Sequence, residues 1–118
     1  MEAGEDRLQA EAYQWFHNTY PELRGLLNYN FNNSRNKIEG AKNKAMGLQA
    51  ERSDMVLYLK GKAFMIEWKT PKGKQQGKQK DWQELIEKQG FSYFIVRSLD
   101  EFKTLIQTLC SSFKNSQN

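Results

Sequence analysis

The chain has 118 residues, of which 38% are hydrophobic and 13% aromatic, so residues 1–118 are long and apolar enough for one folded domain and too short for two. Its single cysteine, Cys110, excludes an internal disulfide framework and a multi-cysteine metal site, and no apolar run is long enough for a signal peptide or a membrane span. We therefore expect a cytoplasmic protein with a modest net charge of +4 and no membrane partner.

The first half of the chain predicts two helices around a short strand. Apolar residues recur at helical spacing over residues 5–20, and Pro21 ends that helix. A strand over residues 26–31 and a polar turn at residues 32–34 follow. A basic helix is expected over residues 35–46, ended by Gly47. Its apolar positions are spaced to face a core: Ile38, Ala41, Ala45 and Leu48.

The second half predicts a hairpin and then a helix, a strand and a helix. The hairpin has arms at residues 54–59 and 62–69, turned by Lys60-Gly61. A helix over residues 77–89, a strand over 91–96 and a last helix opened by a capping box at Ser98 follow. In the first of these helices Trp82, Leu85 and Ile86 are expected to face inward. The order α-β-α-β-β-α-β-α predicts an α/β fold, a mixed sheet flanked by helices.

An acidic residue and a lysine lie two positions apart near the end of the second hairpin arm. Side chains alternate along a strand, so Glu67 and Lys69 point to one face and Trp68 to the other. Asp54 begins the partner arm, and directly opposed residues lie within about 5 Å across a ladder. Two carboxylates this close repel each other unless a divalent cation binds between them.

These residues suit a hard cation such as Mg²⁺ or Mn²⁺, which prefers carboxylate and carbonyl oxygens. Asp54, Glu67 and the main-chain carbonyl of Trp68 offer three such ligands. A cation held there activates water for phosphodiester hydrolysis, and Lys69 would orient that water or hold the phosphate. The alternative is an ordinary acid–lysine surface pair. The apolar residues 63–66 and the nearby Asp54 favour the catalytic interpretation, because buried charges require a partner.

Basic residues cluster in two stretches of the chain. Between residues 60 and 80 there are seven lysines and one acidic residue, Glu67, and Glu39 is the only acid between residues 35 and 44. Such clustering is typical of a polyanion-binding surface, although a solvated lysine face is the alternative. Contacts to a DNA backbone are expected from Arg35, Lys37, Lys42, Lys44, Lys72, Lys74 and Lys78. Such contacts read DNA shape rather than sequence.

The acidic residues and the lysine lie within a longer ordered set of motifs. In chain order these are Met46-Gly47, Ser53-Asp54-Met-Val-Leu, Ile66-Glu67-Trp-Lys69-Thr-Pro-Lys-Gly73, Gln79-Lys-Asp-Trp82, Gly90-Phe-Ser-Tyr-Phe-Ile-Val-Arg97-Ser98 and Asp100-Glu101-Phe102. The set resembles the VRR-NUC domain of the PD-(D/E)XK nuclease superfamily over nearly the whole chain. Pro21-Glu22-Leu23 and the turn at Asn32 are also similar to stand-alone phage members.

The resemblance implies a restriction-endonuclease-like core and a Mg²⁺- or Mn²⁺-dependent endodeoxyribonuclease centred on Asp54, Glu67 and Lys69. Glu11 matches the upstream acid of the family, which holds the metal directly or through a water. Gln79 matches the glutamine that completes the active-site face. Without the resemblance, a residue placed like Glu11 is more often a partner of the helix dipole than a metal ligand, and Gln79 is equally explained as a solvated helix residue.

The resemblance also implies a partner and a substrate. Stand-alone members act as homodimers on branched DNA such as four-way (Holliday) junctions, in a bacterial or phage-infected cell. Cleavage of flaps or single strands by a monomer is an open alternative. The chain departs from the family at Glu51-Arg52-Ser53-Asp54, where a Gly-x-Pro-Asp turn is usual. This departure bears on the approach of the substrate more than on the chemistry, because Asp54 itself is present.

Two rival functions belong to other classes. One is a non-catalytic DNA-binding module that retains the nuclease fold and has lost turnover. The other is a protein–protein adaptor whose lysines only increase solubility. The intact set of Asp54, Glu67 and Lys69 favours the enzyme over both.

Overall fold

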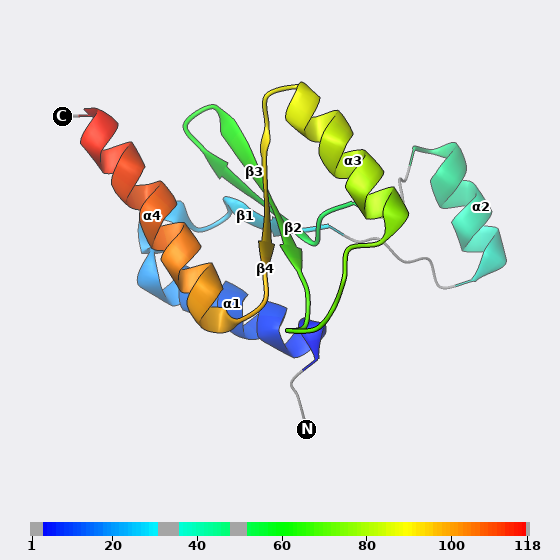
Figure 1. Ribbon diagram of the computed structural model, residues 1–118, viewed down its shortest axis with the longest axis horizontal. Helices are drawn as coiled ribbons and strands as arrows, with labels where there is room; N and C mark the ends of the chain where they lie inside the picture. The colour runs from blue at the N-terminus through cyan, green and yellow to red at the C-terminus, as the bar shows by residue number, and fades with distance from the viewer. Residues whose placement is uncertain (1–3, 31–35, 48–51, 118) are drawn as a thin grey trace. The chain divides into compact units, whose positions relative to one another are not determined.

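The computed structural model describes residues 4–30, 36–47 and 52–117, with side chains as far as Ser111. Arg35, Glu51 and the turn at residues 32–34 therefore lie outside the described residues. The elements in chain order are α1 (Glu5–Thr19), η1 (Pro21–Leu23), β1 (Leu27–Tyr29), α2 (Lys37–Ala45), β2 (Met55–Leu59), β3 (Lys62–Trp68), α3 (Gly77–Lys88), β4 (Ser92–Val96) and α4 (Leu99–Gln117), as Figure 1 shows. The predicted order of helices and strands is confirmed, with the short 3-10 helix η1 added after Tyr20.

The residue contacts divide the chain into two compact units. Unit 1 comprises Met1–Arg24, Trp68–Lys74 and Ile95–Asn118, and unit 2 comprises Gly25–Glu67 and Gln75–Phe94. The division falls within β3, directly after Glu67, and within β4, directly after Phe94. Each unit thus takes one end of these two strands.

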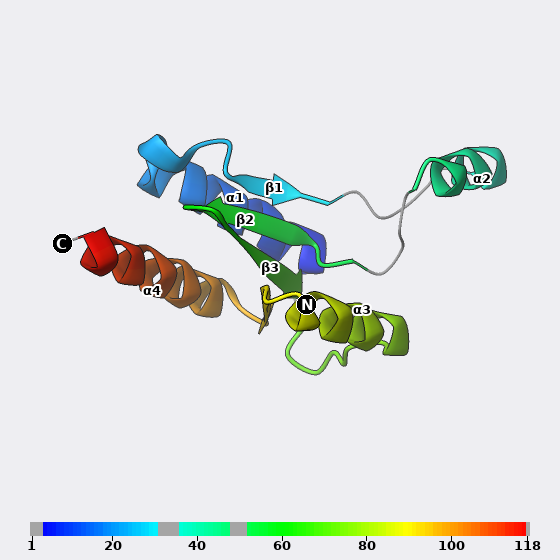
Figure 2. The same ribbon diagram turned by 90° about the horizontal axis from the view of Figure 1, so that it is seen from above.

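The four strands form one mixed sheet in the order β1-β2-β3-β4. β1 runs antiparallel to β2, and Figure 2 shows the two strands side by side. β2 runs antiparallel to β3 in a register that pairs Met55 with Ile66 and Leu59 with Lys62. The hairpin turn consists of Lys60 and Gly61, whose φ angles are 38° and 75°. Positive φ at both central residues matches the twist of the strands, so the predicted hairpin and its turn are confirmed.

An aromatic cluster forms the core of unit 1. Trp68 is 0% exposed and stacks on Phe102 of α4, with ring centroids 5.4 Å apart. Trp15 of α1 meets Phe102 edge-on at 6.0 Å. Phe16 and Ile106 are buried as well, so the helical spacing of apolar residues predicted for residues 5–20 is confirmed, and α4 also buries one face. Trp68 therefore anchors the end of β3 in this core.

The two middle helices, both in unit 2, bury less than the sequence predicts. No residue of α2 is buried, and Ile38 is 85% exposed, so the expectation that Ile38, Ala41 and Ala45 face a core is wrong, while Leu48 lies outside the described residues. Two of these positions are alanines, which gain little from burial and cannot by themselves fix a helix on a core. In α3, Trp82 meets Tyr93 of β4 edge-on at 5.8 Å, but Leu85 is 58% exposed and was wrongly expected inward.

The helix starts show how local hydrogen bonds define the elements. At α4 the backbone N–H of Glu101 donates to Ser98 Oγ at 3.1 Å, which confirms one half of the predicted capping box. The carboxylate of Glu101 accepts from the backbone N–H of Arg97 at 2.7 Å instead of from Ser98.

Within residues 4–30, 36–47 and 52–117, no helix has the length and apolar character needed to cross a membrane.

Candidate functional site

Glu67 is the most unusual side chain of unit 2, because it is a carboxylate that is 1% exposed. Its Oε1 accepts a hydrogen bond from the Tyr93 hydroxyl at 2.7 Å. Its Oε2 is buried and has no hydrogen-bond partner among the described residues. A buried carboxylate oxygen without a partner costs several kcal/mol, so a ligand that binds Oε2 would stabilise this arrangement.

Asp54 continues the ladder that leads to Glu67. The ladder between β2 and β3 ends with the pair Met55 and Ile66, so Asp54 and Glu67 occupy the next opposed positions in the same register. Asn30 holds this part of the chain at two points: its backbone N–H donates to Asp54 O at 2.8 Å, and its Nδ2 donates to Ser53 O at 2.9 Å. The start of β2 is therefore fixed by β1.

The pKa of Tyr93 is set by its burial and by the charges around it. Burial raises the pKa of this phenol far above its usual value of 10.0. The hydrogen bond to Glu67 and the charge of Glu67 raise the pKa further, and the charge of Asp54 contributes in the same direction. The carboxylates of Glu67 and Asp54 thus act on one hydroxyl, which keeps its proton and donates to Glu67 at neutral pH.

The donor set fits a small divalent cation. Two carboxylates on opposed strand positions, one with an unpartnered buried oxygen, provide the oxygen ligands that Mg²⁺ and Mn²⁺ prefer. Among the described residues, no group of three or more His, Cys, Asp or Glu side chains is arranged to hold a metal ion. Within unit 2, the structure brings the carboxylate-bearing residues Asp54 and Glu67 to opposed positions on neighbouring strands.

The other predicted catalytic residues are divided between the two units. Lys69 belongs to unit 1; it is half-buried, and its backbone N–H donates to Val96 O at 3.0 Å. Glu11, also in unit 1, pairs with Arg7 at 3.2 Å on the exposed side of α1. Gln79 lies in unit 2, where its Oε1 accepts from the backbone N–H of Gln76 at 2.8 Å and caps α3. Asp54 and Glu67, both in unit 2, are the two predicted catalytic residues that occupy opposed strand positions.

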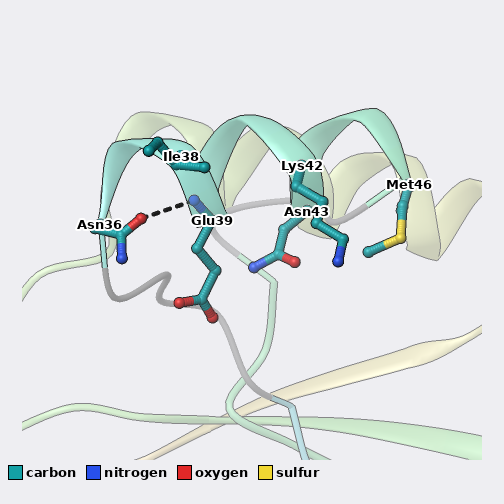
Figure 3. A pocket seen from close by; sticks show the side chains of 6 residues that line it. All are labelled: Asn36, Ile38, Glu39, Lys42, Asn43 and Met46. Carbon is teal, nitrogen blue, oxygen red and sulfur yellow. Dashed lines mark hydrogen bonds between the residues drawn. The ribbon is translucent and has the colours of Figure 1, made fainter.

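The predicted DNA-binding lysines are exposed on their own elements. α2 carries Lys37, Lys42 and Lys44, and exposed lysines also occupy positions 72, 74 and 78. Figure 3 shows Lys42 beside Met46 in a hollow along α2, whose start is capped by a hydrogen bond from the Glu39 backbone N–H to Asn36 Oδ1 at 2.8 Å. Arg35, the other predicted contact, lies outside the described residues.

The loop that carries Lys72 and Lys74 is held in a defined conformation within unit 1. Arg97 Nη1 donates to Thr70 O at 2.9 Å and to Gly73 O at 2.6 Å. The backbone N–H of Gly73 also donates to Thr70 O, at 3.0 Å. The loop therefore presents its lysines from an ordered turn, which lowers the entropy lost when they bind a ligand.

Three residues that hold Glu67 or the chain around Asp54 carry no recognisable signal in the sequence. Tyr93 stands in an apolar strand and resembles an ordinary core aromatic, and Asn30 resembles a turn residue. Ser53, at 0% exposed, occupies the position before Asp54, and its Oγ donates to Met55 O at 3.2 Å. Next to it, the guanidinium of Arg52 lies over the Trp82 ring at 5.3 Å. The residues just before Asp54 are thus held by a buried serine hydroxyl and a cation–π contact.

Comparison with solved structures shows what this fold is similar to. One match, described as a VRR_NUC domain protein, has a TM-score of 0.77 at 21% identity and covers 92% of this chain and 88% of its own. A second, described as a VRR_NUC domain, has a TM-score of 0.60 at 22% identity and covers 87% of this chain and 94% of its own. No family model and no curated protein matches the sequence.

Proposed function

We propose that this chain, which has the fold of VRR_NUC domain proteins, is a Mg²⁺- or Mn²⁺-dependent DNA endonuclease whose 118 residues act as a single nuclease domain. The observation that carries the proposal is the buried Glu67 carboxylate, with one unpartnered oxygen at the position opposite Asp54. A fold does not by itself determine an activity, so the side chains of Glu67 and Asp54 support the proposal more directly than the fold does.

Each predicted residue has a separate task in the proposed reaction. Asp54, Glu67 and the main-chain carbonyl of Trp68 hold the cation. When bound, the cation supplies an activated water and offsets charge on the scissile phosphate. Lys69 follows Glu67 by two positions, the spacing that directs strand side chains to one face, and it orients the nucleophile or the phosphate.

Glu11 and Gln79 assist the same site in the proposal. Glu11 supplies a further carboxylate to the cation, directly or through a water. To do so, it gives up its exposed ion pair with Arg7. Such an exposed pair is weak, so breaking it costs less than about 1 kcal/mol. Gln79 acts through its amide NH₂ group, because its Oε1 already caps α3.

The proposed substrate is branched DNA, with four-way junctions as the preferred form and a homodimer as the active species. A twofold dimer places two equivalent sites so that paired strands of a junction are cut symmetrically. Lysines and arginines would hold the phosphate backbone, which favours recognition of DNA shape. The residues assigned to this task are Arg35, Lys37, Lys42, Lys44, Lys72, Lys74 and Lys78.

The test is cleavage of labelled four-way junction, flap, single-stranded and linear duplex DNA in Mg²⁺, in Mn²⁺ and in EDTA. Wild-type protein is expected to cut the junction only when a metal is present. Asp54→Ala and Lys69→Ala proteins, verified as folded by circular dichroism, are expected to bind DNA and leave it intact. Binding without cleavage in every metal would instead identify a non-catalytic DNA-binding module.

The lysine contacts predict a change in the salt dependence of DNA binding. In a Lys72→Ala/Lys74→Ala/Lys78→Ala protein, each lost phosphate contact should reduce the slope of log K against log[salt] by about 0.9. Affinity is expected to fall to a similar extent for all DNA sequences. Fluorescence anisotropy across a salt series measures the slope. Lys88→Ala, an exposed lysine at the end of α3, is the matched control and should leave it unchanged.

A further inference from the structure

Tyr93 holds Glu67 in an asymmetric way. The phenol hydroxyl occupies Oε1 at 2.7 Å, whereas Oε2 of the same carboxylate has no partner among the described residues. Glu67 and Tyr93 are both less than a tenth exposed, so water does not compete strongly for this bond. The carboxylate can therefore offer one oxygen to a ligand without losing the bond that orients it.

The tyrosine is itself fixed by neighbours in unit 2. Trp82 of α3 meets its ring edge-on at 5.8 Å and 68°. Gln75, also in unit 2, is itself held by a hydrogen bond from its Nε2 to Gln83 Oε1 at 2.8 Å. The bond to Glu67 is thus made by a group with little freedom to move.

We propose that Tyr93 is a positioning residue that limits Glu67 to coordination of the cation through Oε2 alone and so selects small octahedral cations over Ca²⁺. This inference rests on the proposed function of the site. Mg²⁺ and Mn²⁺ sites use carboxylates through single oxygens and retain waters, whereas Ca²⁺ takes six to eight oxygens and often binds both oxygens of one carboxylate. The hydroxyl bound to Oε1 competes with a cation for that oxygen and so disfavours binding through both oxygens.

The experiment measures metal binding without DNA and without turnover. Mn²⁺ binding is followed by the electron paramagnetic resonance signal of free Mn²⁺, and Ca²⁺ is added as the competitor. Tyr93→Phe removes one oxygen atom and retains the ring that contacts Trp82. Tyr58→Phe is the matched control, because Tyr58 lies on β2 and is 48% exposed. Circular dichroism verifies the fold of both proteins.

Tyr93→Phe is expected to bind Mn²⁺ about tenfold more weakly, the usual effect of removing a group that orients a metal ligand. Its preference for Mn²⁺ over Ca²⁺ should narrow, because Glu67 is then able to use both oxygens. Tyr58→Phe should behave as wild type. A role in packing alone would change the melting temperature and leave the ratio of the two metal affinities unaltered.

Two outcomes separate this inference from the proposed function. If wild type and Tyr93→Phe bind Mn²⁺ and Ca²⁺ alike, the role of Tyr93 is overturned and the metal site stands. If wild type binds Mn²⁺ no better than Glu67→Gln, the metal site itself is overturned. Should Tyr93→Phe fail to fold, wild type labelled with 3-fluorotyrosine is titrated with Mg²⁺. A ¹⁹F signal of Tyr93 that does not shift during Mg²⁺ binding would then refute the inference.

Discussion

Glu67→Gln is expected to lower the rate of metal-dependent junction cleavage by roughly 10²–10³-fold, because a lost charged ligand removes several kcal/mol of transition-state stabilisation. The substitution retains the size of the side chain and an oxygen that accepts from Tyr93. Its effect is therefore on the cation rather than on packing. Single-turnover cleavage with saturating protein measures the rate of the chemical step.

The same substitution should largely remove the stabilisation of the protein by metal. In Mn²⁺, wild type is expected to gain thermal stability by mass action, and Glu67→Gln is expected to gain little. In EDTA the variant should be at least as stable as wild type, because the buried oxygen that lacks a partner becomes part of a neutral amide. Glu84→Gln, an exposed position on α3, is the control. Equal cleavage by Glu67→Gln and wild type would remove Glu67 from the metal site.

Trp68→Ala is expected to destabilise the protein by about 3–5 kcal/mol, the usual effect of truncating a large buried aromatic residue. Trp68 is 0% exposed and stacks on Phe102, so the substitution leaves a cavity beside α4. For a domain of this size such a change is a large part of the total stability. Urea denaturation followed by circular dichroism measures the loss.

The control for this prediction is Tyr58→Ala, which truncates an aromatic residue that is 48% exposed on β2. It should cost less than about 1 kcal/mol, because little packing is lost at the surface. A Trp68→Ala protein as stable as Tyr58→Ala would show that the aromatic cluster of unit 1 is not the core that holds the end of β3. A destabilised variant should also lose cleavage, because Trp68 lies between Glu67 and Lys69 in the chain.

Much of the fold could be predicted because the signals are local. The hairpin follows from two apolar runs joined by Lys60-Gly61, and both residues adopt the positive φ that this turn requires. The burial of Glu67 follows from the apolar residues before it, and the stripes of α1 and α4 follow from helical spacing. Errors arose where the apolar signal was weak: two of the described apolar positions of α2 are alanines, and Ile38 is 85% exposed.

The sequence by itself determined the order of the elements, the opposed positions of Asp54 and Glu67, and the choice of carboxylates over histidine or cysteine for the site. Only the tertiary structure decided which groups complete that site. Tyr93 reaches Glu67 from 26 positions along the chain, and Asn30 anchors Ser53 from 23 positions away. Such partners are set by strand order and packing rather than by local pattern, because a hydrogen bond between distant residues leaves no periodic trace in the sequence.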